Sequence, residues 1–235
     1  MLAITVIIIH AFRAFVNLFI KNIPKTPFLA ISLAFLAKIC YTVDTKNNAE
    51  DIMNEVQSIA TYESKIKKVL ISEEEIKDAI ARAGKYINDL YDGRPVLLVS
   101  ILKGAFVFMA DVLRAVTIPV EIDFMVAKSY YSGTVSSGMV QITMDLSHDV
   151  SKYHLVILED IVDTGRTLHD VVGLLRERNP LSLHVITLLD KPERRVVDYT
   201  PDLSLFTIPD HFVIGYGLDC AELYRNLPYV AEYGE

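Results

Sequence analysis

The stretch from residue 155 to residue 168 constrains the fold more than any other part of the chain. It opens with four consecutive apolar residues, 155–158, which is the pattern of a strand buried on both faces of a parallel sheet. The acid pair Glu159-Asp160 follows, where we expect that strand to end. Residues 163–167 then form a short loop rich in hydroxyl groups, and a helical pattern at 168–178 comes directly after it. This order predicts a strand, a loop and a helix in immediate succession.

A loop between a strand and the start of a helix is suited to bind an anion. Backbone N–H groups converge there, and the helix dipole adds partial positive charge. Asp163 lies in this loop, so three acids fall within five residues, and their charges repel unless hydroxyls, a cation or the helix end compensates. The acids could serve sugar hydroxyls, a metal or a proton transfer, or could only cap the helix. A cap normally needs one such group, which favours a binding function.

Strand and helix patterns alternate along the rest of the chain. Further strands are predicted at 69–71, 96–102, 120–127, 139–144, 182–189, 203–208 and 212–214, and further helices at 72–91 and 105–115. The alternation predicts an α/β domain whose mostly parallel sheet is flanked by helices. Functional groups gather at the carboxyl ends of strands in such sheets. Because Lys103, Glu159-Asp160 and Lys191 each follow a predicted strand, we expect them at one edge of the sheet.

Other polar residues also follow predicted strands. Gly104 lets the backbone turn sharply after Lys103 and present its N–H to an anion, although a turn glycine beside a solvated lysine is an equal alternative. Arg194-Arg195, Phe212-Val213 and Asp219 would each be unremarkable alone, as a solvated charge run, a core aromatic and a turn acid. Their shared position after strand ends favours a functional interpretation.

The acidic balance of the chain argues against a nucleic-acid partner. The chain carries 23 basic and 30 acidic residues, a formal net charge of -7, whereas a nucleic-acid surface needs a basic patch. An anionic substrate must therefore be held by a few placed groups. The two cysteines, Cys40 and Cys220, lie far apart and outside metal-binding spacing, so we expect neither a disulfide framework nor a zinc site, and a reducing compartment is indicated.

Residues 1–43 differ from everything that follows. They contain no acid and four basic residues, Arg13, Lys21, Lys25 and Lys38. Two apolar runs, at 4–20 and 28–41, are each shorter than the roughly 20 residues that a membrane-spanning helix needs. The composition fits a targeting leader or a membrane-associated segment. An extension that is absent from the working protein is an equally good interpretation.

Met53 offers an internal start, and residues 53–235 have the length of a complete domain. We therefore expect residues 1–52 to be a hydrophobic leader or extension with its linker, and residues 53–235 to be the functional domain. We expect a cytoplasmic protein. The alternative is organelle targeting or membrane association, with membrane contact only through residues 4–41.

Several segments resemble one family of enzymes. Residues 156–165 read VILEDIVDTG and are similar to the phosphoribosyl-diphosphate signature of type I phosphoribosyltransferases. Segments around it resemble the hypoxanthine(-guanine) branch of that family, and they read SILKGAF at 100–106, KSY at 128–130, LDKPERR at 189–195 and VIGYGLD at 213–219. The resemblance implies that family's fold, with a small hood and a mobile active-site loop that contains Ser129 and Tyr130.

The resemblance also implies which residues hold phosphoribosyl diphosphate: Lys103, Gly104, Glu159, Asp160, Asp163, Thr164, Gly165, Arg166, Thr167 and Arg195. The loop groups would bind the 5′-phosphate, with Arg166 at a variable position adding a phosphate contact. The acid pair would address the ribose hydroxyls. Lys103-Gly104 would hold the diphosphate through a cis peptide, with Arg195 as a second ligand.

The purine-binding residues implied in the same way are Lys191, Phe212, Val213 and Asp219. Lys191 would donate to the 6-oxygen, Phe212 would stack on the base, and Val213 would present main-chain groups to its edge. Asp219, together with Glu159 and Asp160, would be a ligand of Mg²⁺, a hard cation that suits carboxylates and diphosphate oxygens. Cys220 stands where an aromatic residue commonly follows this aspartate.

The resemblance implies an enzyme of purine salvage that makes IMP or GMP from phosphoribosyl diphosphate and hypoxanthine or guanine, in a Mg²⁺-dependent reaction. Asp163 would be the catalytic residue that moves the purine N7 proton. We expect a homodimer or homotetramer whose partners are the two substrates. Two alternatives stay open: a regulatory module that binds phosphoribosyl diphosphate without turnover, and a protein anchored through its N-terminal segment.

Overall fold

The computed structural model describes residues 61–129 and 140–234. The expectations for the leader, for the boundary at residue 52 and for Tyr130 lie outside the described residues. The chain divides into two compact units, Met1–Ser64 and Lys65–Glu235. The strands and helices named in the following paragraphs all belong to the second unit.

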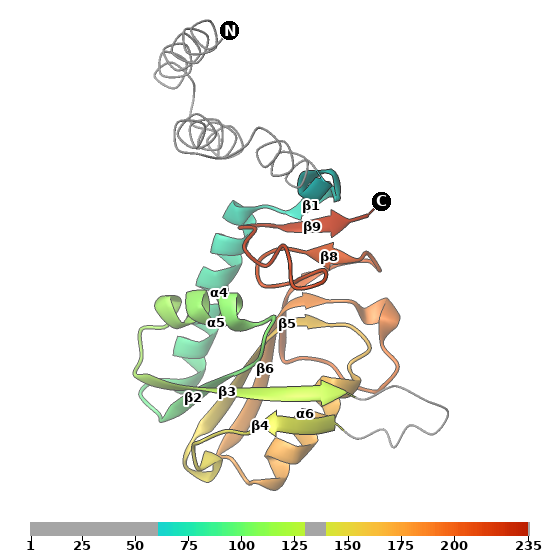
Figure 1. Cartoon of the computed structure of the whole chain (residues 1–235). Helices are drawn as coiled ribbons and strands as arrows, with labels where there is room; N and C mark the ends of the chain where they lie inside the picture. The colour runs from blue at the N-terminus through green and yellow to red at the C-terminus, as the bar shows by residue number, and fades with distance from the viewer. Residues whose placement is uncertain (1–60, 130–139, 235) are drawn as a thin grey trace, which may run out of the picture. The chain divides into compact units, whose positions relative to one another are not determined.

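A six-stranded sheet forms the centre of the second unit, and its strand order is β4-β3-β2-β5-β6-β7 (Figure 1). The strands are β2 (Val96–Ile101), β3 (Val120–Ser129), β4 (Val140–Met144), β5 (His154–Val162), β6 (Ser182–Asp190) and β7 (Leu203–Thr207). All neighbours pair in parallel except β3 and β4, which are antiparallel. The predicted α/β class with a mostly parallel sheet is confirmed.

Helices cover both faces of this sheet (Figure 1). α4 (Glu73–Tyr91) and α5 (Phe106–Ala115) share one hydrophobic core with Leu98, whereas α6 (Arg166–Glu177) shares the opposite core with Leu97. Successive side chains of a strand point to opposite faces, so one apolar run supplies both cores. α4 begins with a capping box, because the Ser72 N–H donates to the Glu75 carboxylate at 2.8 Å and the Ser72 hydroxyl accepts from the Glu75 N–H.

A second, antiparallel sheet of order β1-β9-β8 forms the small hood that the family resemblance implied. Its strands are β1 (Ile66–Ile71), β9 (Val230–Tyr233) and β8 (Val213–Ile214). Two short 3₁₀ helices, η1 (Val150–Lys152) and η2 (Pro192–Arg194), complete the described elements. β9 was not predicted, since its four residues show no alternation of apolar and polar side chains that would mark a strand.

The prediction that β5 ends before the acid pair is wrong. β5 continues through Glu159-Asp160 to Val162, because β6 supplies ladder partners along this length: Glu159 pairs with Thr187 and Val162 with Asp190. The acids therefore belong to the last half of a strand. α6 also begins at Arg166, two residues before the predicted start. Lys103 follows the end of β2 and Lys191 follows the end of β6, as predicted.

Among the described residues, no helix combines the length and the apolar character that crossing a membrane would require.

Gly84 allows α4 to approach α5 closely. A Cβ added there would lie 2.7 Å from both the Cβ and the carbonyl oxygen of Ala115. Alanine gains about 1 kcal/mol of helix propensity over glycine, but overpacking costs about 1–3 kcal/mol. We expect Gly84→Ala to lower the free energy of unfolding, measured in urea. Gly173→Ala on α6 is the matched control, since its Cβ would meet nothing within 4 Å, and it should be neutral or stabilising. A stabilised Gly84→Ala protein would contradict the tight contact.

Candidate active site

Two adjoining cavities open at the carboxyl ends of the central strands. The loop cavity, of about 290 Å³, lies over the connection between β5 and α6. The hood cavity, of about 500 Å³, extends to residues 212–225. The two cavities share part of their lining. The residues that line both are Leu102, Lys103, Gly104, Ala127, Asp160, Ile161 and Asp163. This shared set forms a common floor.

The connection between β5 and α6 has the features of an anion site. Asp163, Thr164, Gly165 and Thr167 line the loop cavity, and α6 begins beside them with its N-terminal N–H groups. Gly165 caps the helix in the left-handed conformation, with φ of +80°, and a Cβ there would lie 2.7 Å from Arg195 Cδ. Glycine is therefore required by both conformation and space.

Both acids of the pair lie inside β5, where Asp160 lines both cavities and Glu159 lines the loop cavity. Burial raises the pKa of Glu159 well above its ordinary value, and the neighbouring charge of Asp160 adds to the effect. Burial likewise raises the pKa of Asp160 to about 6. Glu159 Oε2 is enclosed and receives no hydrogen bond from the described residues. An enclosed acceptor of this kind suits a donor that a ligand brings, such as a sugar hydroxyl.

Lys103 and Gly104 follow β2 and lie between the two cavities. The cis peptide that the resemblance implied is present between Leu102 and Lys103. Asp160 packs directly on Gly104, since a Cβ there would lie 1.7 Å from Asp160 Oδ2. On the other side, a Cβ on Gly217 would lie 2.1 Å from the Gly104 carbonyl oxygen. The backbone at Gly104 is thus held between the acid pair and residues 215–219.

The far end of the hood cavity offers one buried cation and one exposed ring. Lys191 is 6% exposed, and its Nζ donates to the His211 carbonyl. Phe212 is 56% exposed and packs edge-on against Tyr233, with ring centroids 5.6 Å apart. Val213 is buried in β8. An ammonium donor, an exposed ring and a strand edge can together hold a flat polar heterocycle.

Residues 219–225 add groups that the sequence did not single out. Arg225 Nη2 lies 2.7 Å from Asp219 Oδ1, and Arg225 Nη1 donates to the Gly217 carbonyl at 2.8 Å. Glu222 accepts from Lys103 Nζ at 3.1 Å through each of its carboxylate oxygens. Arg225 and Glu222 both line the hood cavity. The only signal for them was their closeness to Asp219 in the chain.

Asp163 has a cationic neighbour that was likewise not assigned to the site. Arg194 Nε lies 2.7 Å from Asp163 Oδ1, and Arg194 also pairs with Asp210 at 3.2 Å. Asp163 lines both cavities. Its carboxyl group therefore stands where the two cavities meet.

The structure does not bring every predicted residue to the cavities. Arg195 lies behind the loop, pairs with Asp190 and donates to the Asp163 carbonyl at 3.2 Å. Arg166 is exposed at the start of α6 and lines neither cavity. Ser129 is the last residue of β3. Arg195 thus braces the loop through Asp190 and the Asp163 carbonyl, and its role as a diphosphate ligand stays a prediction.

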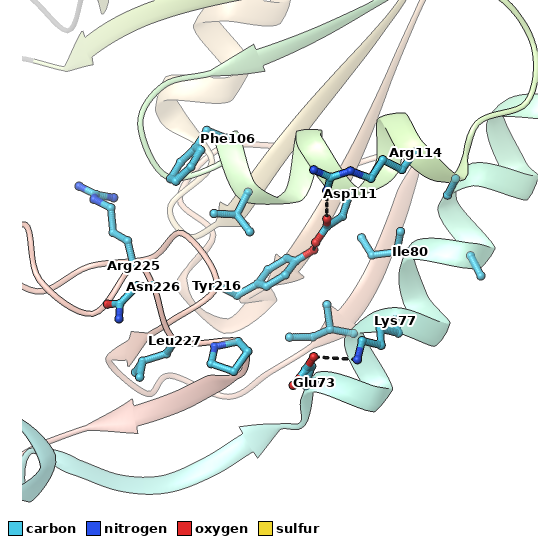
Figure 2. Close-up of a pocket in the computed structure, with 15 residues that line it drawn as sticks. Glu73, Lys77, Ile80, Phe106, Asp111, Arg114, Tyr216, Arg225, Asn226 and Leu227 are labelled. Atoms are coloured by element: carbon cyan, nitrogen blue, oxygen red, sulfur yellow. Dashed lines mark hydrogen bonds and ion pairs between the residues drawn. The ribbon is translucent and has the colours of Figure 1, made fainter. Parts of the chain in front are cut away.

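A third cavity, the helix cavity of about 670 Å³, lies between α4, α5 and residues 216–228 (Figure 2). The hydroxyl of Tyr216 donates to Asp111 at 2.7 Å across it. Burial and the Asp111 carboxylate raise the pKa of Tyr216, which keeps the hydroxyl protonated as a donor. This bond ties α5 to the segment whose Gly217 packs on Gly104, so the helix cavity lies behind the part of the common floor that contains Gly104.

The carboxylates can contribute to a Mg²⁺ site but do not form one alone. Within the described residues, no group of three or more histidine, cysteine, aspartate or glutamate side chains is placed to hold a metal. Asp160 and Asp219 nevertheless line the same cavity, and Glu159 keeps an unused buried oxygen. Mg²⁺ commonly takes one or two protein carboxylates and completes its shell with phosphate oxygens and water. The donors present fit that pattern.

The chain matches the family model of the phosphoribosyl transferase domain over residues 66–221. It is 46% identical over 168 residues to the hypoxanthine-guanine phosphoribosyltransferase of Streptococcus pneumoniae, covering 72% of this chain and 93% of that protein. It is 47% identical over 167 residues to the hypoxanthine phosphoribosyltransferase of Salmonella typhimurium, covering 70% of this chain and 94% of that protein.

Solved structures agree with these relatives. A hypoxanthine phosphoribosyltransferase from Staphylococcus aureus superposes with a TM-score of 0.71 at 42% identity, covering 74% of this chain and 95% of that one. A hypoxanthine-guanine phosphoribosyltransferase from Bacillus anthracis gives a TM-score of 0.69 at 41% identity, covering 72% and 99%.

Fold and site together define an α/β protein with cavities at the carboxyl ends of its parallel strands, where such sheets bind their ligands. The chain belongs to the phosphoribosyltransferase family, in its hypoxanthine(-guanine) branch, and the resemblance predicted from the sequence is confirmed.

Removing the charge of Glu159 should stabilise the fold. A buried acid whose folded-state pKa is raised costs stability progressively as pH rises above its unfolded pKa. We expect Glu159→Gln to increase the free energy of unfolding by about 1 kcal/mol at pH 7.5, within the range for an unpaired buried polar group, and by less at pH 5. Urea unfolding at both pH values measures this. Glu177→Gln, on the exposed end of α6, should give no such gain. A destabilised Glu159→Gln protein would show that the carboxylate is compensated.

Proposed function

We propose that this protein is a purine-salvage enzyme that transfers the 5-phosphoribosyl group from phosphoribosyl diphosphate to hypoxanthine and to guanine. The products are IMP or GMP and diphosphate. The observation that carries the proposal is the common floor of the two cavities. A sugar bound over the loop would present its C1′ to a base in the hood cavity. The activity named for the relatives at 46–47% identity supports the same reaction.

The loop cavity suits the ribose 5-phosphate. Thr164 and Thr167 supply hydroxyls, and the start of α6 supplies backbone donors and the positive end of its dipole. Arg166 at the first helical position can add a phosphate contact from the surface. Glu159 and Asp160 would accept hydrogen bonds from the ribose hydroxyls. An enclosed carboxyl without a partner is satisfied by such a donor.

The diphosphate would lie over Lys103 and Gly104, which are shared by both cavities. Arg195 would be a second diphosphate ligand, and Arg225, which lines the hood cavity, would add a further cation. The cofactor would be Mg²⁺, held by Asp219, Asp160 and Glu159 together with substrate oxygens. When bound, Mg²⁺ supplies charge stabilisation for the departing diphosphate.

The base would occupy the hood cavity against Phe212. Lys191 Nζ is buried and fixed by the His211 carbonyl, so it can donate to the 6-oxygen of hypoxanthine or guanine. Val213, at the start of β8, would present main-chain groups to the edge of the ring. Asp219 closes the same cavity. Cys220 follows Asp219 at a position where the family commonly has an aromatic residue, and this difference bears on base preference.

The reaction breaks the C1′–O bond of phosphoribosyl diphosphate and forms a C1′–N bond to the purine through an oxocarbenium-like state. Lys103 and Arg225 would stabilise the negative charge that develops on the departing diphosphate. Asp163, which stands where the cavities meet, would accept the purine N7 proton. Ser129 and Tyr130 would belong to a loop that closes over the substrates and excludes water.

We also propose a cytoplasmic enzyme that functions as a homodimer or homotetramer, with residues 53–235 as the catalytic domain. A regulatory module that binds phosphoribosyl diphosphate without turnover is the second candidate. The presence of Lys103 and Asp163 on the common floor, and of Asp219 in the hood cavity, argues against this module.

The reaction is tested directly with the purified protein. Incubation with phosphoribosyl diphosphate, Mg²⁺ and hypoxanthine should yield IMP, and guanine should yield GMP, both detected by chromatography. Addition of a chelator should abolish both. Tight binding of phosphoribosyl diphosphate with no nucleotide from hypoxanthine, guanine or xanthine would support the regulatory module instead.

Asp163→Asn tests the proposed proton transfer. We expect the turnover number to fall by about 10²–10⁴-fold, the usual contribution of general acid–base catalysis. The dissociation constant for phosphoribosyl diphosphate should change much less, because the carboxylate acts on the base. Asp170→Asn is the matched control, since this acid lies one turn into α6 and outside both cavities. An equal loss of binding and turnover would show that Asp163 serves only the phosphate loop.

A further inference from the structure

Glu222 places a carboxylate among the cations of the hood cavity. Each of its oxygens accepts from Lys103 Nζ at 3.1 Å, and Oε2 lies 3.2 Å from Arg225 Nη2. Lys103 and Glu222 are 119 residues apart, so the fold and not the local sequence makes this pair. The reaction as proposed assigns roles to both cations but none to Glu222.

The backbone around Glu222 is built to present this side chain. The Glu222 N–H donates to Asp219 Oδ2 at 2.8 Å. Ala221 and Glu222 both adopt left-handed φ angles, +52° and +68°. Non-glycine residues rarely adopt this conformation, and two in succession persist only where surrounding contacts hold them. The Asp219 bond is such a contact, and it directs Glu222 towards Lys103.

Exposure separates this ion pair from the structural pairs of the site. The side chains of Lys103 and Glu222 are 67% and 65% exposed, whereas those of Arg195 and Asp190 are 13% and 12% exposed. Water screens an exposed pair, so its net stability is small and it is easily exchanged for a stronger partner. A diphosphate, with several negative charges, is a stronger partner for Lys103 and Arg225 than one carboxylate is.

We propose that Glu222 is an internal counter-ion of the diphosphate subsite, which competes with diphosphate for Lys103 and Arg225. This inference rests on the proposed function, because it takes these two cations as diphosphate ligands. The competition weakens diphosphate binding on both sides of the reaction. Its consequence is faster release of the diphosphate product, a step of the kind that limits turnover in many enzymes.

The test is Glu222→Gln in the full-length protein, which keeps the size of the side chain and removes its charge. Titration calorimetry with inorganic diphosphate and Mg²⁺ should show a dissociation constant about two- to fivefold lower, the range expected for removing one exposed charge interaction. The KM for phosphoribosyl diphosphate should fall in parallel. Glu222→Asp, which keeps the charge, should stay near the unmodified protein.

Two controls isolate the diphosphate subsite. Glu73→Gln removes the same charge from a comparable exposed pair on α4, where Glu73 lies 2.7 Å from Lys77, and it should leave diphosphate binding unchanged. IMP carries no diphosphate, so its affinity should be the same for Glu222→Gln and the unmodified protein. A change in IMP affinity equal to that for diphosphate would indicate a general disturbance of the site and would overturn the inference.

The direction in which Glu222→Gln changes diphosphate affinity distinguishes the counter-ion role from a role in orienting Lys103. If Glu222 instead orients Lys103 for the ligand, Glu222→Gln weakens diphosphate binding, and the counter-ion role is overturned. Unchanged binding overturns it as well. Either result would leave the proposed function standing, provided that the unmodified protein binds diphosphate and makes IMP. A protein that binds neither diphosphate nor IMP would overturn the proposed function and this inference together.

Discussion

The close approach of Gly104 to Asp160 is the constraint on which the rest of the site depends. A Cβ on Gly104 would lie 1.7 Å from Asp160 Oδ2, and a Cβ on Gly217 would lie 2.1 Å from the Gly104 carbonyl oxygen. Three segments far apart in the chain therefore meet at one backbone position. Any side chain there would push them apart and divide the floor that the loop cavity and the hood cavity share.

Two ion pairs near this contact differ in their exposure to water, and they have different roles. The buried pair of Arg195 and Asp190 fixes the backbone of the loop at residues 163–167 through the Asp163 carbonyl. The exposed pair of Lys103 and Glu222 is screened by water and can be exchanged for a ligand. Desolvation makes a buried pair costly to break, so it suits a brace, and solvation makes an exposed pair labile, so it suits a binding site.

Local patterns predicted most of the architecture. The apolar runs of β2 and β5 were recognisable because their signals lie within a few residues. The end of β5 was misplaced because two adjacent acids look like a strand terminus, although β6 continues to pair with them. The pairing of Arg195 with Asp190 was not predicted, because Asp190 was assigned no role from the sequence.

The sequence by itself determined the α/β class, the succession of strand, loop and helix around residues 163–167, and the family, because each rests on residues that are neighbours in the chain. The meeting of Gly104, Asp160 and Gly217, and the pairing of Lys103 with Glu222, were decided only by the tertiary structure. The parallel pairing of β2 with β5 and the approach of the C-terminal segment to Gly104 bring these residues together. No local pattern carries that information, since a side chain's partner across the fold depends on the path of the whole backbone.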